Sequence, residues 1–237
     1  MEKAMQNEKV KFTEFIVQSF TAFCVSFLAC QTGFICAWPS YTVTNFLSNA
    51  TVLVTPMTSL EASLLGSLSN VGALAATPFC VPAFDTMGRK CASMFFGLPY
   101  VIAWTIISLT SNVILVLIAI CLAGVGIAGQ NVAIIFISEI SHDSIRGGLT
   151  GCTVSFYFLG LLISYVLGAY LTYTQVIYTH LTLSVLAVLL VGLLPESPVF
   201  LVFVGKEKEA AKSISYYRRL EVTSKEVEAH IAKIKMQ

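Results

Sequence analysis

Six long runs of apolar residues, separated by short polar connections, dominate this chain. A bilayer core requires about 20 consecutive apolar residues per helix, and lipid-exposed backbone must satisfy its own hydrogen bonds, which favours helices. The sequence therefore predicts an all-α membrane protein with a six-helix bundle over residues 15–194, a polar N-terminal segment at 1–14 and a polar tail at 195–237. The expected spans are Phe15–Trp38, Ser63–Phe84, Ser93–Leu109, Val113–Ile137, Leu149–Leu171 and Val176–Leu194.

Composition supports lipid as the main solvent. Hydrophobic residues make up 56% of the chain, charged residues only 11%, and the net charge of +1 argues against nucleic acid as a partner. The seven cysteines contain no CxxC pair, and most lie inside apolar runs. We interpret them as small packing residues, with no disulfide framework and no metal site.

The basic residues predict the orientation. In a six-span arrangement all 14 Lys and Arg residues fall on one side, in the N-terminal segment, two connections and the tail. The positive-inside rule then predicts a cell-membrane protein with both termini in the cytoplasm. Asn49, in the sequon Asn49-Ala50-Thr51, lies on the opposite side, where glycosylation is expected.

The tail differs in character from the rest of the chain. Over residues 206–237 charged and apolar residues alternate, which favours one or two short amphipathic helices on the cytoplasmic face. A solvated linker is the alternative.

Three clusters of acidic and basic residues fall on the predicted cytoplasmic side. They are "DTMGRK" at 85–90, "SEISHDSIRGG" at 138–148 and "PESP" at 195–198. Gly88 permits a tight turn, and Arg89 offers a planar fork for a carboxylate. We predict a charge network that closes the cytoplasmic end of a pathway, formed by Asp85, Arg89, Glu139, Arg146 and Glu196. The alternative for the first cluster is an ordinary solvated turn.

The G-x-G-x-x-G pattern at 124–129 lies in the middle of a predicted span. A dinucleotide site would require a preceding strand and an accessible helix N-terminus. We interpret these glycines as points where helices approach closely.

At this level the sequence resembles the sugar porter family of the major facilitator superfamily, in particular its insect facilitated trehalose and glucose transporters. "SLEASLLGSLSNVGALAA", "DTMGRK", "SEISHDSIRGGLTG" and "PESPVFL" carry the resemblance, in the order found in the family. It implies alternating access between two six-helix bundles around a sugar site. Family members have twelve spans, so this chain resembles the N-terminal half. A second bundle, from missing sequence or a homodimer, is the expected partner.

Four positions depart from the family pattern. Ile120 stands where an arginine is usual, Ile134 where proline is frequent, and Phe136 replaces tyrosine. Val154 occupies the position of a sugar-contacting glutamine. The loss of that polar group weakens the expectation of monosaccharide affinity.

The residues favour facilitated, uncoupled movement of a hexose or trehalose. Proton-driven relatives carry an acid in the first span, whereas Phe15–Trp38 has none. Candidate path residues are Gln31, Thr32, Gln130, Asn131 and Tyr157, with Ser155 and Tyr165 as further polar groups. Each of them alternatively forms hydrogen bonds within its own bundle.

The sequence offers two alternatives to transport. A truncated, non-transporting membrane protein that binds a partner or senses a ligand is the main alternative, motivated by Val154 and Ile120. An enzyme is disfavoured because no catalytic arrangement lies in a span. His142, His180 and His230 are expected at or beyond the membrane faces, and no cofactor is predicted.

Overall fold

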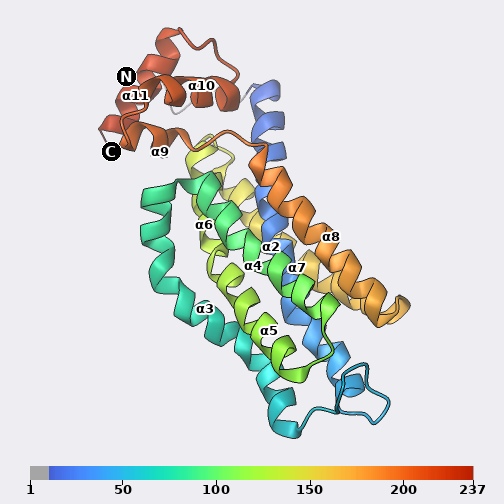
Figure 1. Ribbon diagram of the computed structural model, residues 1–237. Helices are drawn as coiled ribbons and strands as arrows, with labels where there is room; N and C mark the ends of the chain where they lie inside the picture. The colour runs from blue at the N-terminus through green and yellow to red at the C-terminus, as the bar shows by residue number, and fades with distance from the viewer. Residues whose placement is uncertain (1–10, 237) are drawn as a thin grey trace.

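The computed structural model describes residues 11–236, apart from the side chain of Val81, and every regular element in that range is a helix. Figure 1 shows an elongated bundle with a small cap of short helices at one end, formed by residues 198–235. Residues 1–10, which include Lys3 and Lys9 of the polar N-terminal segment, lie outside the described range. The helices are α2 (Phe12–Phe46), α3 (Ser59–Met87), α4 (Arg89–Leu109), α5 (Val113–Ala128), α6 (Gln130–Ile140), α7 (Arg146–Tyr170), α8 (Tyr173–Gly192), α9 (Pro198–Phe203), α10 (Glu207–Arg218) and α11 (Lys225–Lys235).

The predicted all-α membrane fold is confirmed. Five segments are long and apolar enough to cross a membrane: α2, α4, the pair α5 and α6, α7 and α8. The remaining predicted span is α3, which has 29 residues but is not among those five. It carries polar and helix-disturbing side chains at Ser67, Asn70, Thr77 and Pro78.

Local sequence signals set the helix ends. Thr58 and Glu61 form a reciprocal capping box at the start of α3. Asn112 accepts hydrogen bonds from the N–H groups of Ile114 and Leu115, so α5 begins after only three intervening residues from the end of α4. The connection between the third and fourth predicted spans is therefore a tight turn.

Glycines allow the two most extensive helix contacts. A Cβ atom at Gly160 of α7 would overlap the carbonyl oxygen of Cys30 in α2. A Cβ atom at Gly124 of α5 would overlap the carbonyl oxygen of Ser69 in α3. Gly124 belongs to the G-x-G-x-x-G pattern. It lies where α3 and α5 approach closely, in agreement with the interpretation of these glycines as packing positions.

An aromatic core fills the end of the bundle away from the tail. Trp38, Trp104 and Phe34 are fully buried, with Trp38 and Trp104 edge to face at 5.6 Å between ring centroids. His180 is also fully buried and stacks on Phe34 at 4.6 Å. The sequence places His180 at or beyond a membrane face. In the structure its side chain lies inside the bundle, enclosed by the rings of Phe34 in α2 and Trp104 in α4.

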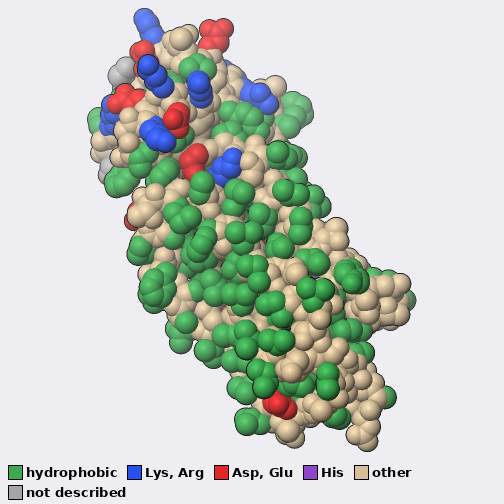
Figure 2. Space-filling model, viewed as in Figure 1, with side chains coloured by type: hydrophobic (Ala, Val, Ile, Leu, Met, Phe, Trp, Pro, Cys, Tyr) green, Lys and Arg blue, Asp and Glu red, His purple; other side chains and the backbone are tan. Residues whose placement is uncertain are grey.

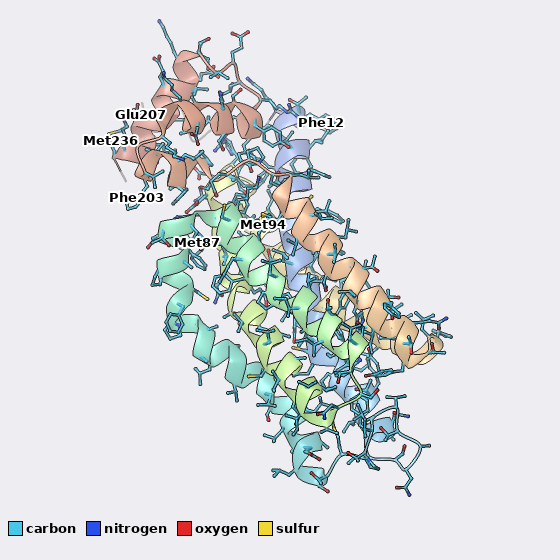
Figure 3. All side chains as sticks on the ribbon, viewed as in Figure 1. Phe12, Met87, Met94, Phe203, Glu207 and Met236 are labelled. Atoms are coloured by element: carbon cyan, nitrogen blue, oxygen red, sulfur yellow. The ribbon has the colours of Figure 1, made fainter. Side chains whose placement is uncertain are left out.

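The tail folds into three short helices against one end of the bundle. The Tyr217 hydroxyl donates to the carbonyl oxygen of Pro195 (2.8 Å), and Ser213 donates to that of Glu196 (2.6 Å). Burial raises the pKa of Tyr217, so its hydroxyl keeps the donated proton. Phe203 and Met236 project outward from this cap, 76% and 81% exposed (Figure 3).

Charge is distributed unevenly along the molecule. On the face drawn in Figure 2 the Lys and Arg side chains gather over the cap, and apolar side chains cover the long middle section. The loop between α2 and α3, which contains the exposed Asn49, lies at the opposite end (Figure 1).

Candidate gate at the cap end of the bundle

Arg89 and Glu139 form the centre of the candidate site. Arg89 Nε donates to both Glu139 carboxylate oxygens, at 2.9 and 3.0 Å, and Nη2 lies 2.8 Å from Oε1. Arg89 Nη1 also donates to the carbonyl oxygen of Phe84 (3.2 Å), and the guanidinium lies over the ring of Phe200. The two side chains are only 14% and 12% exposed. The pair is therefore largely removed from water, although both partners are charged.

The third element of the site is the short segment before α9. The Ser197 hydroxyl donates to Glu139 Oε2 and accepts from the N–H of Phe200, so it also caps α9. Glu139 thus accepts hydrogen bonds from residues of both α4 and the tail. These contacts offset part of the desolvation cost of a buried carboxylate.

Glu196 caps the start of α4. Its Oε1 accepts from the main-chain N–H groups of Lys90 (2.9 Å) and Ser197 (2.8 Å). A carboxylate at a helix N-terminus is stabilised by the helix dipole. Gly88 makes this approach possible, because its φ of +86° suits glycine and a Cβ atom there would overlap the Glu196 carboxylate.

The structure brings together only part of the predicted network. Arg89, Glu139 and Glu196 converge, and the exposed Asp85 lies 3.8 Å from Arg89 at the edge. Arg146 lies outside this cluster. It pairs with the exposed Asp143, three residues earlier in the α6–α7 connection, because it begins α7 and its side chain follows that connection. Met87 and Met94 flank the turn that carries Arg89 (Figure 3).

A second polar cluster joins the tail to the start of α2. Arg218 Nη1 donates to Glu14 Oε1 (2.8 Å), and Gln18 Nε2 donates to the same oxygen (2.9 Å) and to the carbonyl oxygen of Tyr217 (3.2 Å). Gln18 Oε1 accepts from the N–H of His142 (2.8 Å). Sequence reasoning missed this cluster, because nothing in the sequence around Glu14 and Gln18 indicates a partner about 200 residues away.

The candidate path residues divide into two groups. Gln31 bonds to Leu183 and Ser184 of α8, and Thr32 pairs with Tyr100 of α4 at 2.8 Å, so both are satisfied inside the bundle. The partly or fully exposed members are Gln130, Asn131, Ser155, Tyr157 and Tyr165. Gln31 and Thr32 therefore form hydrogen bonds within their own bundle, which is the alternative to lining a substrate path.

A cavity of about 690 Å³ lies between the bundle and the cap. The cavity is lined by the start of α2 with the preceding Lys11, the end of α6, the α6–α7 connection and all three tail helices. Charged lining residues include Lys11, Glu139, Arg146, Arg218 and Lys233. The carboxylate side of the Arg89–Glu139 pair therefore borders a space large enough for solvent.

Comparison with known proteins identifies the family. The family described as "Sugar (and other) transporter" matches residues 12–237. The chain belongs to this family. It has the architecture of the N-terminal half of a sugar porter of the major facilitator superfamily, and it is a multi-pass membrane protein.

Named relatives are insect transporters. The chain is 28% identical over 203 residues to the facilitated trehalose transporter Tret1 of Polypedilum vanderplanki, covering 85% of this chain and 40% of the relative. It is 25% identical over 218 residues to the facilitated trehalose transporter Tret1 of Apis mellifera ligustica, covering 91% and 42%. The chain thus spans less than half the length of these relatives.

Solved structures share the fold. The xylose transporter XylE from E. coli, in a partially occluded inward-open conformation, is similar over 93% of this chain and 58% of its own, with a TM-score of 0.73 and 19% identity. The human organic anion transporter MFSD10 is similar over 90% of this chain and 59% of its own, with a TM-score of 0.57 and 12% identity.

Proposed function

We propose that this chain forms the N-terminal half of a facilitative sugar transporter that moves a hexose or trehalose by alternating access. The observation that carries this proposal is the enclosed joint between Arg89, Glu139 and Ser197, which ties α4, α6 and the tail together at one end of the bundle. Family membership supplies the substrate class.

The joint has the properties expected of a cytoplasmic gate. It consists of a few short charged contacts, and a helix movement of a few ångströms breaks them all together. Water entering from the adjoining cavity then solvates the separated charges, so the open state is also accessible. Asp85, Arg89, Glu139 and Glu196 are the proposed gate residues, and Arg146 stabilises the neighbouring connection through Asp143.

Exposed faces support a second six-helix bundle as the partner. Only 17% of the most apolar stretch of α7 is buried, against 78% in α2. The exposed face of α3 carries Ser63, Ser67, Asn70 and Thr77 at helical spacing. The hydroxyls of Ser63, Ser67 and Thr77 donate to carbonyl oxygens within α3. Lipid tails do not satisfy the Asn70 amide, whereas neighbouring helices or a watery path do. We place the second bundle, or a second copy of this chain, against α3 and α7.

Uncoupled transport fits the positions of the acids. Among the described residues of the bundle, Glu14, Glu61, Asp85, Glu139 and Asp143 all lie near helix ends or in connections. His180 is enclosed by Phe34 and Trp104 and offers no route to solvent. With no acid at mid-depth to carry a proton, sugar flux is expected to be independent of a pH gradient.

The orientation in the membrane is part of the proposal. The described basic residues cluster at the cap end, which we place in the cytoplasm. Asn49 then faces outside and accepts a glycan. Removal of N-linked glycans from protein made in insect cells should shift its electrophoretic mobility, and Asn49→Gln should abolish the shift. An unglycosylated wild-type chain would count against this orientation.

Uptake into vesicles tests the transport proposal. The protein isolated from its native membrane, with any bundle that accompanies it, is reconstituted and supplied with labelled glucose or trehalose. Uptake above that of protein-free vesicles, insensitive to a pH gradient and slowed by Arg89→Met, supports the proposal. Uptake equal to that of protein-free vesicles for both sugars would sink it.

A non-transporting, partner-binding role is the second candidate. It is favoured by the inward pairing of Gln31 and Thr32, which removes two polar groups from any path. It is also favoured by Val154, which is 50% exposed at the position where the resemblance to the family implies a sugar-contacting glutamine. Saturable sugar binding without uptake would favour this role.

A further inference from the structure

The Ser93 hydroxyl, near the start of α4, is buried without a hydrogen-bond partner among the described residues. The residue is 2% exposed and its oxygen has no contact with solvent. A hydroxyl left unpaired in an apolar interior destabilises the fold, so a buried orphan calls for an explanation.

A small cavity lies beside this hydroxyl. Its volume is about 10 Å³, and its lining includes Ser93, Thr32, Tyr100 and Gln130. This volume is close to the minimum that accommodates one water molecule, which also requires two to four polar partners.

The lining supplies those partners. The Thr32 and Tyr100 hydroxyls lie 2.8 Å apart and share one hydrogen bond, which uses one of their two hydrogens and leaves the other available. Ser93 provides an unused donor and acceptor, and the Gln130 side-chain amide provides both as well. Ser93, the Thr32–Tyr100 pair and Gln130 therefore supply at least three sets of donors and acceptors to the cavity.

The cavity also borders the break between α5 and α6. Gly126 and Gly129 line it. The Gly129 N–H bonds to the Gly126 carbonyl oxygen (3.1 Å), three residues earlier, and not to the carbonyl oxygen four residues earlier as in a regular α-helix. α5 ends at Ala128 and α6 begins at Gln130. Helices bend where their hydrogen-bond ladder is interrupted, and an inserted water is one recognised cause.

We propose that one structural water molecule is bound in this cavity, between Ser93, the Thr32–Tyr100 pair and Gln130, and that it fixes the orientation of α6 relative to α5. Glu139 lies nine residues beyond Gln130 on α6, so the water also sets the position of the Arg89 partner. The water site itself does not depend on the transported substrate.

The first test measures the melting temperature of Ser93→Ala in purified protein. If water is bound, the substitution removes one of its partners and lowers the melting temperature, by about 2–4 °C for a loss of about 1 kcal/mol. If the cavity is dry, the substitution removes an unsatisfied hydroxyl and raises it. Ser67→Ala, at an exposed position of α3, is the control for the Ser-to-Ala change in a helix.

The second test detects the water directly. Brief X-ray radiolysis in ¹⁸O-labelled water hydroxylates aromatic rings next to bound water. Phe96 lines the cavity and Phe84 does not, although they are 3% and 4% exposed. Faster labelling of Phe96 than of Phe84, together with a lower melting temperature for Ser93→Ala, supports the proposal. Labelling of Phe96 no faster than Phe84, or a raised melting temperature, overturns it.

Discussion

Arg89, the first residue of α4, and Glu139, the penultimate residue of α6, are joined by two hydrogen bonds from one guanidinium nitrogen, at 2.9 and 3.0 Å. They are 50 positions apart in the sequence, and both side chains are largely buried. An ion pair in that setting contributes little net stability, yet removing one partner leaves a buried charge uncompensated. This asymmetry makes the pair a suitable switch and a measurable one.

Arg89→Met should destabilise the chain strongly. It leaves the Glu139 carboxylate buried with only the Ser197 hydroxyl as a side-chain donor, and the free energy of unfolding should fall by about 3 kcal/mol. Denaturant unfolding of the purified chain measures the change. Arg146→Met removes an exposed pair and should cost less than about 1 kcal/mol. Equal losses for the two variants would contradict the enclosed pair.

Glu14→Gln should loosen the cap while leaving the bundle folded. The change removes a charged partner of Arg218 but retains every trypsin site. With roughly 1.5 kcal/mol lost from the docked state, cleavage after Arg219 should accelerate about tenfold. Limited proteolysis followed by mass spectrometry gives the rate. Glu209→Gln, whose partner Lys206 lies at 3.8 Å on the surface, serves as the control, and an equal acceleration there would refute the docking role of Glu14.

Gly160→Val should prevent the native packing of α2 against α7. Its side chain would overlap the backbone of Cys30, which cannot move without displacing the longest helix of the bundle. Size-exclusion chromatography of the solubilised chain should show loss of the monodisperse species. Gly66→Ala places a methyl group in open space and should leave the profile unchanged. A normal profile for Gly160→Val would show that α2 and α7 do not pack closely at this crossing.

His180→Phe should preserve or increase stability. Both imidazole nitrogens are buried without partners in the described structure, and a phenyl ring can stack on Phe34 without unsatisfied atoms. The expected gain in the free energy of unfolding is about 1 kcal/mol. Ser184→Ala, which removes a hydroxyl that donates to Gln31, should lower it by about the same amount. A marked loss for His180→Phe would indicate a polar partner for the imidazole.

The long-range polar contacts were only partly predictable. Arg89, Glu139 and Glu196 stand out in the sequence because charges are rare there and fall next to predicted spans. Ser197 does not stand out, since a serine before a proline is an ordinary helix cap, and its contact with Glu139 depends on how the tail folds back. Glu14 and Gln18 were assigned to a polar end and an apolar span, with no sign that α10 docks on both.

The sequence by itself determined that this chain is a bundle of membrane-spanning helices. Hydrocarbon excludes charge and unpaired backbone groups, so apolar length and the positions of Lys and Arg already define the segments and suggest their direction. Only the tertiary structure decided which polar groups meet. Arg146 pairs with Asp143, Gln31 with Ser184 and Arg218 with Glu14. These partners depend on helix rotation and on close helix crossings at glycines, which apolar periodicity alone leaves undetermined.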